Sequence, residues 1–273
     1  IGFLKRVFDK LMLNFTWWVN RKDRDGRNVF EGGFLGLDNI GVFDRSAPLP
    51  TGGYLEQADG TAWMAFFAQQ MFQISLELAA QDPSYEDMAV KFFEHFLWIA
   101  ASMDHVGDDN EELWDEADGF FYDVLRMPDG SSQRLRVRSL VGLLPLCAST
   151  VIEPTDIRRF EKLRGRMGWI IRERQELLKT IAPPEKPSAS GRHLLSILDE
   201  HKLRRVLTRM LDESEFLGSY GIRSVSRYHE DHPFEFDVNG QTFSVDYQPA
   251  ESESGLFGGN SNWRGPFWMP LNG

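Results

Sequence analysis

The chain has 273 residues, of which 42% are hydrophobic, 13% aromatic and 26% charged. This composition supports a large hydrophobic core and excludes disordered and fibrous classes. The 30 basic and 41 acidic residues give a net charge of −11. Because an acidic surface repels phosphate groups, neither nucleic acid nor an anionic membrane is expected as a partner. The single Cys147 excludes an internal disulfide framework and predicts a reducing, cytoplasmic location.

Both ends of the sequence lie within patterned segments. Leu4, Phe8, Leu11 and Phe15 have the spacing of one helix face from the first turn onward. The last segment, residues 260–270, is rich in Asn, Trp, Gly and Pro and then stops. We therefore interpret residues 1–273 as part of one domain that was cut from a longer polypeptide. Its length needs no second domain.

A Gly-rich stretch over residues 24–61 is the first candidate for a functional loop. Glycine allows positive φ angles and close approach of the backbone to a ligand. The stretch leads into residues 61–80, which are apolar on nearly every face and predict an inner helix. Residues 85–103 carry apolar and charged faces, which predicts an outer amphipathic helix.

The second half continues the pattern of loops and helices. A loop over 114–123 precedes an apolar segment, 139–152, which predicts a helix bent at Pro145. Amphipathic helices are predicted over 156–177 and 194–213. Residues 234–247 alternate apolar and polar side chains on either side of Asn239-Gly240, which predicts a β-hairpin with a type I′ turn.

Successive helix pairs with unusual residues in their connecting loops predict an all-α fold that carries one small hairpin. If the pairs close into a ring, their loops converge on one end and form a funnel-shaped site. Helical bundles and solenoids give a similar periodicity, so the sequence pattern alone leaves the ring open.

The loops contain carboxylates, amides, guanidinium groups and tryptophans, which suit the hydroxyl groups and flat C–H faces of a sugar. No Cys/His cluster with zinc spacing, phosphate-binding loop or Gly-Xaa-Ser-Xaa-Gly motif occurs. We therefore expect neither a metal nor another cofactor. Paired-carboxylate chemistry, as in glycoside hydrolysis, is the leading prediction.

Asp59 is the best candidate for the general acid, because it ends the Gly-rich loop and opens an apolar helix. Apolar neighbours such as Trp63 would raise its pKa by desolvation. The alternative is that Asp59 is only the N-cap of that helix. Asp38 lies in a similar position, for which a local Asx-turn is the alternative.

Two further kinds of residue have structural as well as functional interpretations. Trp114 and Trp263 lie in loops beside Asp and Arg residues, which favours a sugar platform over core packing. Arg138 precedes an apolar segment and could contact either the acidic loops or a ligand. Asp44 and Arg45 are adjacent and predict a local ion pair.

Four strings of residues resemble glycoside hydrolase family 63, which includes processing α-glucosidases and mannosylglycerate-hydrolase-like enzymes. The strings are Phe34-Leu35-Gly36-Leu37-Asp38-Asn39, Gln57-Ala58-Asp59-Gly60-Thr61-Ala62-Trp63, the segment 113–123, and Asn262-Trp263-Arg264-Gly265-Pro266-Phe267-Trp268. The resemblance runs from about residue 14 to the C-terminus and is closest to the uncharacterised bacterial branch. It implies an (α/α)6 barrel, inversion at an α-glycosidic bond, and Asp59 as general acid.

The predicted substrate is an α-linked glucoside or a related oligosaccharide. The predicted substrate-binding residues are Phe34, Asp38, Asn39, Trp63, Trp114, Asp115, Arg138, Trp263, Arg264 and Trp268.

The resemblance places the general base on a Glu downstream of the Trp263-Arg264-Gly265-Pro266 string, beyond Gly273. We therefore expect the chain alone to be inactive. The first alternative is a non-catalytic glycan-binding or regulatory α/α-toroid module. The second is a helical scaffold whose loop acids merely cap helices.

Overall fold

The computed structural model describes residues 1–20, 28–30, 40–45, 47–104, 112–179, 181–183, 186–219 and 221–248. Six α-helices lie within these ranges: α1 (Gly2–Val19), α2 (Ala58–Ala79), α3 (Glu86–Ser102), α4 (Pro154–Arg159), α5 (Glu161–Glu173) and α6 (Glu200–Met210). Five short 3-10 helices accompany them: η1 (Pro83–Tyr85), η2 (Leu140–Gly142), η3 (Leu144–Cys147), η4 (Gln175–Leu178) and η5 (Arg227–Glu230).

The strands of the described ranges pair in an antiparallel manner. A three-stranded sheet has the order β1 (Tyr54–Glu56), β4 (Asp123–Arg126) and β5 (Ser132–Leu135). Four two-stranded pairs are β2 (Trp114–Asp115) with β3 (Phe120–Phe121), β6 (Ser149–Ile152) with β7 (His193–Ser196), β8 (Leu217–Gly218) with β9 (Gly221–Ile222), and β10 (Phe234–Val238) with β11 (Gln241–Val245).

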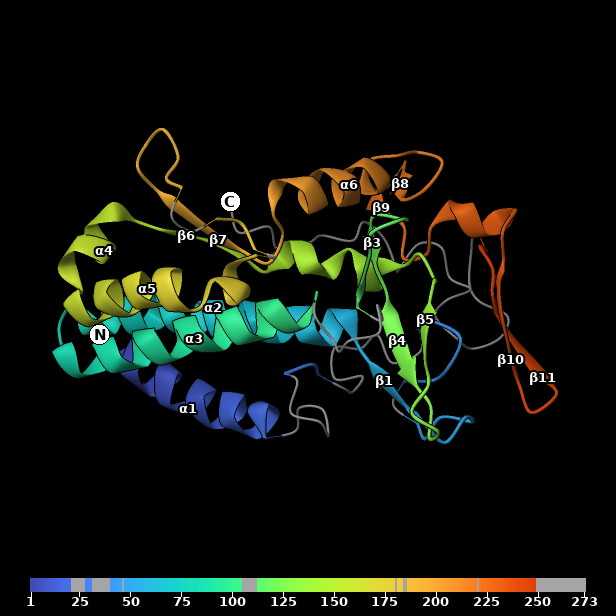
Figure 1. The fold of residues 1–273 in the computed structure, drawn as a ribbon, viewed down its shortest axis with the longest axis horizontal. Helices are drawn as coiled ribbons and strands as arrows, with labels where there is room; N and C mark the ends of the chain where they lie inside the picture. Colours follow the sequence, from blue (N-terminus) through green and yellow to red (C-terminus); the bar gives the residue numbers. More distant parts are fainter. Residues whose placement is uncertain are drawn as a thin grey trace.

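The longest helices and the three-stranded sheet lie at opposite ends of the molecule, and the strand pair β6–β7 lies at the helical end (Figure 1). The helices α1, α2, α3 and α5 lie side by side at one end, and the sheet β1-β4-β5 and the hairpin β10–β11 lie at the other (Figure 1). The helix α2 packs against both α1 and α3. It buries residues on every face, as the apolar pattern of this segment predicts. Its first turn meets the strands, so this turn joins the two ends.

The all-α prediction is wrong, because the chain is a mixed α/β protein with several antiparallel strand pairs. The described residues form no ring of helix pairs, and the (α/α)6 barrel is therefore also wrong. The segment 139–152 accounts for much of the error, since it forms η2, η3 and the strand β6. Pro145 removes a helical hydrogen bond, and Thr150, Val151 and Ile152 favour a strand.

Other local predictions agree with the structure in part. The hairpin is confirmed: Phe234 pairs with Val245, and both residues of the Asn239-Gly240 turn have positive φ angles. The predicted helix 194–213 is instead the strand β7 followed by α6. The N-cap of α2 is Gln57. Asp59 therefore lies inside the first turn, and its N-cap interpretation is wrong.

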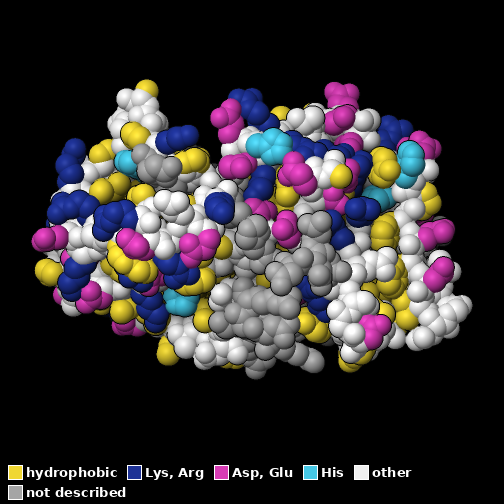
Figure 2. Space-filling view, in the orientation of Figure 1, with side chains coloured by type: hydrophobic (Ala, Val, Ile, Leu, Met, Phe, Trp, Pro, Cys, Tyr) yellow, Lys and Arg dark blue, Asp and Glu magenta, His cyan; other side chains and the backbone are white. Residues whose placement is uncertain are grey.

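Two hydrophobic cores correspond to the two ends of the molecule. The larger one contains helix residues such as Phe72 and Phe92, together with strand residues such as Phe120 and Leu195. The smaller one lies under the strands and contains Phe43, Leu125 and Phe236. On the face shown in Figure 2, acidic and basic side chains are interspersed. Within the described ranges, every helix is too short or too polar to cross a membrane.

Gly142 at the end of η2 provides a test of this packing. A Cβ at this position would overlap the ring of Phe120 and the backbone oxygen of Phe121. We expect Gly142→Ala to lower the free energy of unfolding in urea by about 1–3 kcal/mol, because an overpacked core must shift.

Gly165→Ala is the matched control for that substitution. Gly165 lies in α5 with open space around its Cα. In that helix, alanine should raise the free energy of unfolding by about 0.5–1 kcal/mol. Equal changes in the free energy of unfolding for Gly142→Ala and Gly165→Ala would contradict the close contact at Gly142.

Candidate functional site

Asp59 lies in an enclosed ion cluster at the first turn of α2. Its side chain is only 3% exposed and receives two contacts from the guanidinium of Arg45, one of them at 2.8 Å between Nη1 and Oδ2. The backbone N–H of Gly60 donates to Oδ1 at 2.8 Å. Two parallel N–H donors from an arginine form the geometry that binds a carboxylate group. Arg45 therefore pairs with Asp59, fourteen residues along the chain.

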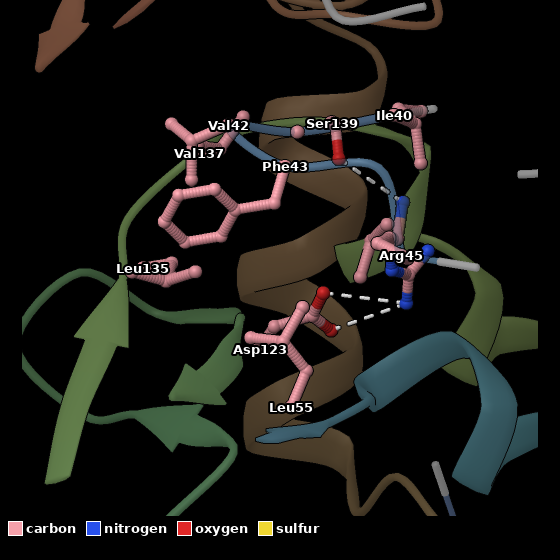
Figure 3. A pocket seen from close by; sticks show the side chains of 11 residues that line it. Ile40, Val42, Phe43, Arg45, Leu55, Asp123, Leu135, Val137 and Ser139 are labelled. Atoms are coloured by element: carbon pink, nitrogen blue, oxygen red, sulfur yellow. Dashed lines mark hydrogen bonds and ion pairs between the residues drawn. The ribbon is translucent and has the colours of Figure 1, made fainter. Parts of the chain in front are cut away.

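A second carboxylate shares the same guanidinium. Oδ2 of Asp123, at the start of β4, lies 3.3 Å from Nη2 of Arg45. Oδ1 of Asp123 also accepts the N–H of Ala58 at 2.9 Å. Figure 3 shows Arg45 facing both oxygens of Asp123. The adjoining cavity has a volume of about 20 Å3, which is enough for one water molecule.

The environment of Asp123 changes its protonation. Burial raises the pKa of its carboxyl group, Arg45 lowers it, and the charge of Asp59 raises it again. The net result is a pKa of about 6. Burial disfavours the charged form of Asp123 more strongly than Arg45 favours it, so Asp123 takes up a proton at a higher pH than an ordinary carboxyl group. Asp123 is therefore protonated at mildly acidic pH and mostly ionised at pH 7.

A larger, open cleft lies between the loop 115–122 and the segment 228–234. Its volume is about 510 Å3, which is within the range of small-molecule sites. The residues that line it are Asp115, Ala117, Asp118, Tyr122, Arg136, Arg138, Tyr228, His229, His232, Pro233 and Phe234. Two predicted substrate-binding residues, Asp115 and Arg138, therefore lie together in one cleft.

An ion-pair network forms the wall of this cleft. Arg138 donates to Asp118 at 2.7 Å and to Glu215 at 3.0 Å. Arg209 also contacts Asp118 and Glu215, and Tyr122 donates its hydroxyl hydrogen to Asp118. Burial raises the pKa of Asp118, but the hydrogen bonds from Arg138 and Tyr122 outweigh it, so that the pKa falls below its usual value. The carboxylate of Asp118 is therefore ionised and held in place.

His229 fixes the backbone at the floor of the cleft. Its Nε2 accepts the N–H of Arg138 at 2.9 Å, and its Nδ1 lies 2.8 Å from the carbonyl oxygen of His232. Burial lowers the pKa of His229, which favours the neutral imidazole. A neutral ring with hydrogen on Nδ1 satisfies both contacts. This histidine therefore has a positioning role.

The cluster around Asp59 and the cleft lie on opposite sides of one chain segment. Leu135, Val137 and Ser139 line the small cavity beside Arg45, whereas Arg136 and Arg138 line the large cleft. Successive side chains thus alternate between the two spaces, as they do along extended backbone. The structure consequently brings Asp115 and Arg138 together but places Asp59 across the segment from them.

The two described tryptophans among the predicted site residues pack within the protein. Trp63 lies in α2 against Phe66, with the ring centroids 5.6 Å apart. Trp114 is buried, donates its indole N–H to Glu116 at 2.6 Å, and packs on Phe121. Neither ring is among the residues that line the large cleft. These contacts give no support to the predicted sugar platform at Trp114 or to the predicted substrate contact of Trp63.

Six predicted substrate-binding residues lie outside the described residues: Phe34, Asp38, Asn39, Trp263, Arg264 and Trp268. The sequence analysis did not select Asp118, Asp123, Tyr228 or His232 as site residues. Asp118 and Asp123 belong to the 114–123 loop, which the sequence analysis selected as a segment. Considering each acidic residue of that loop separately would have identified both as candidates. Tyr228 and His232 come from a segment about 90 residues away from Arg138, and no local pattern connects the two.

Comparison with known proteins gives one informative relative. The chain is 56% identical over 282 residues to a Saccharomyces cerevisiae protein described as "Uncharacterized protein YMR196W". The alignment covers 99% of this chain and 26% of the yeast protein, so the chain spans about a quarter of the length of that relative. No family model matches the chain. Since neither comparison names glycoside hydrolase family 63, membership of that family stays a prediction.

The raised pKa of Asp123 predicts how stability changes with pH. The folded protein binds the proton of Asp123 up to about pH 6, whereas the unfolded chain releases it near the ordinary value of 3.8. The stabilisation is therefore complete below pH 3.8 and is lost as the pH rises through about 6. We expect that Asp123→Asn, which cannot titrate, will not lose stability in this way as the pH rises.

Urea unfolding of both proteins from pH 4 to pH 8 measures the effect. The stability advantage of the wild type over Asp123→Asn should decrease by at most about 3 kcal/mol across this range, since each pKa unit corresponds to about 1.4 kcal/mol. Parallel curves for the two proteins would show that Asp123 does not titrate in this interval.

Proposed function

We propose that this chain forms part of the substrate site of a glycoside hydrolase that acts, with inversion, on an α-linked glucoside or a related oligosaccharide. The observation that carries the proposal is the cleft of about 510 Å3, which contains Asp115 and Arg138. The resemblance of the four sequence strings to glycoside hydrolase family 63 supports the same function.

The chemistry of the cleft suits a carbohydrate. Hydroxyl groups donate to carboxylates and accept from guanidinium groups, and the cleft offers Asp118 and Arg138 as well as the phenol of Tyr228. Phe234 and Pro233 add apolar surface for the C–H faces of a sugar ring. The ion pairs hold these polar groups in position before a ligand arrives, which reduces the entropy lost on binding.

The proton donor of the reaction is proposed to be Asp59, as the sequence analysis predicts. A general acid must come within hydrogen-bonding distance of the leaving oxygen. In the structure, Asp59 instead contacts Arg45 across the segment 135–139 from the cleft. Catalysis by Asp59 therefore requires two changes when the substrate binds: Arg45 must be released from Asp59, and the segment 135–139 must move from between Asp59 and the cleft. Asp123 shares the guanidinium of Arg45 with Asp59, and its pKa is raised to about 6.

A non-catalytic glycan-binding module is the second candidate function. The contacts of Asp59 favour it, because a carboxylate held by Arg45 and by the N–H of Gly60 has a sufficient structural role. In this alternative the cleft binds a sugar and Asp59 only joins α2 to the strands. The two candidates make opposite predictions for an Asp59 variant.

Asp59→Asn in the full-length protein separates the two. If Asp59 is the general acid, kcat for hydrolysis of α-linked glucosides should fall by roughly 10²–10⁴-fold, which is the usual contribution of general acid catalysis. The release of free sugar, measured with a panel of α-linked oligosaccharides, reports this loss. Circular dichroism at the assay temperature verifies that the variant is folded.

Asp129→Asn is the matched control, since Asp129 is an exposed residue in the β4–β5 turn. Its turnover should equal that of the wild type. A folded Asp59→Asn protein that loses only a few-fold in kcat would eliminate the acid role. Binding of oligosaccharides without any turnover by the wild-type protein would favour the glycan-binding module.

A further inference from the structure

Arg136 presents unused hydrogen-bond donors to the large cleft. Its Nε donates at 2.8 Å to Oδ2 of Asp115, which is itself buried. This is the one hydrogen bond that the described part of the chain gives the Arg136 guanidinium, and 60% of the side chain is exposed. The buried Asp115 anchors the guanidinium at Nε, and the exposure of the side chain leaves the hydrogens of the two terminal NH2 groups available to a ligand.

Tyr228, which lines the same cleft, provides a second such group. Its ring lies beneath the guanidinium of Arg138, at 3.8 Å, and stacks on His232 with the ring centroids 4.3 Å apart. These two contacts hold the ring in place. Its hydroxyl makes no hydrogen bond to any other described residue, so the O–H can be donated to a ligand.

The acceptors of the same cleft are largely occupied. Both oxygens of Asp118 receive hydrogen bonds from Arg138, and Tyr122 adds a further one. Asp115 accepts from Arg136 through Oδ2 and from the backbone N–H of Asp118 through Oδ1. The cleft therefore has spare donors and few spare acceptors. A ligand that complements it carries an acceptor-rich group in addition to sugar hydroxyls.

We propose that the cleft binds a phosphorylated sugar, with the phosphate held by Arg136 and Tyr228. The two terminal NH2 groups of Arg136 match two phosphate oxygens, as arginine commonly binds phosphate. The hydroxyl of Tyr228 donates to a third oxygen. A carboxylate has only two oxygens in one plane, and the arginine alone would satisfy it. The sugar part of this ligand rests on the proposed function, whereas the phosphate contact does not.

Titration calorimetry with the full-length protein tests the phosphate contact. The probes are glucose 1-phosphate, glucose 6-phosphate, glucose, glucuronate and inorganic phosphate. We expect at least one sugar phosphate to bind about tenfold or more tightly than glucose and glucuronate. Arg136→Gln should remove this preference, because a hydrogen bond to a charged group contributes roughly a tenfold or greater factor in affinity.

Two further variants exclude a loss of folding and a general effect of charge. Arg136→Lys keeps the charge but not the two-pronged geometry, and should retain part of the preference. Arg204→Gln removes an exposed arginine of α6 that pairs with Glu200, and should bind all probes like the wild type. Equal losses in Arg136→Gln and Arg204→Gln would overturn the proposal, as would equal affinities for glucuronate and the sugar phosphates.

The outcomes also separate this proposal from the proposed function. Binding of inorganic phosphate that depends on Arg136, without binding or hydrolysis of any sugar, would support the phosphate contact and refute the carbohydrate function. Hydrolysis of neutral α-glucosides, together with no preference for a sugar phosphate in the wild type, would support the carbohydrate function and refute the phosphate contact.

Discussion

The contact of Arg45 with two buried carboxylates is the interaction on which the arrangement of this protein depends. Asp59 lies in the first turn of the central helix α2, and Asp123 begins β4 of the three-stranded sheet. One guanidinium therefore joins the helical end to the strand end. Two buried carboxylates without their cation would be strongly destabilising, so the joint cannot open at low cost. Burial and the charge of Asp59 raise the pKa of Asp123, whereas Arg45 lowers it.

The ion cluster at Arg45 and the open cleft are two separate polar sites. Because the side chains of residues 135–139 alternate, the enclosed cluster and the open cleft occupy opposite sides of one segment. A different set of ion pairs, centred on Asp118 and Arg138, holds the side chains of the cleft in position. The structure thus separates a buried carboxylate pair from an open polar cleft. This separation distinguishes a hydrolase that must rearrange at Arg45 from a module that only binds its ligand.

Sequence reasoning predicted the elements whose signals are local. The helices α2 and α3 follow from side-chain periodicity, and the hairpin β10–β11 follows from Asn239-Gly240. It failed for residues 139–152, because a short apolar run can be a helix or buried strand, and periodicity does not separate them. The pairing of Arg45 with Asp123 spans 78 residues and leaves no local pattern. Asp115 and Arg138 were found through their residue types, whereas Tyr228 required the fold.

The unfolding free energy of Arg45→Met tests the central claim most directly. If Arg45 compensates both carboxylates, this variant should lose about 3–5 kcal/mol at pH 7, as when one partner of a buried ion pair is removed. The triple variant Arg45→Met, Asp59→Asn, Asp123→Asn should recover most of that loss, because no uncompensated charge stays buried. A loss of less than about 1 kcal/mol in Arg45→Met, the size of an exposed ion pair, would contradict the account.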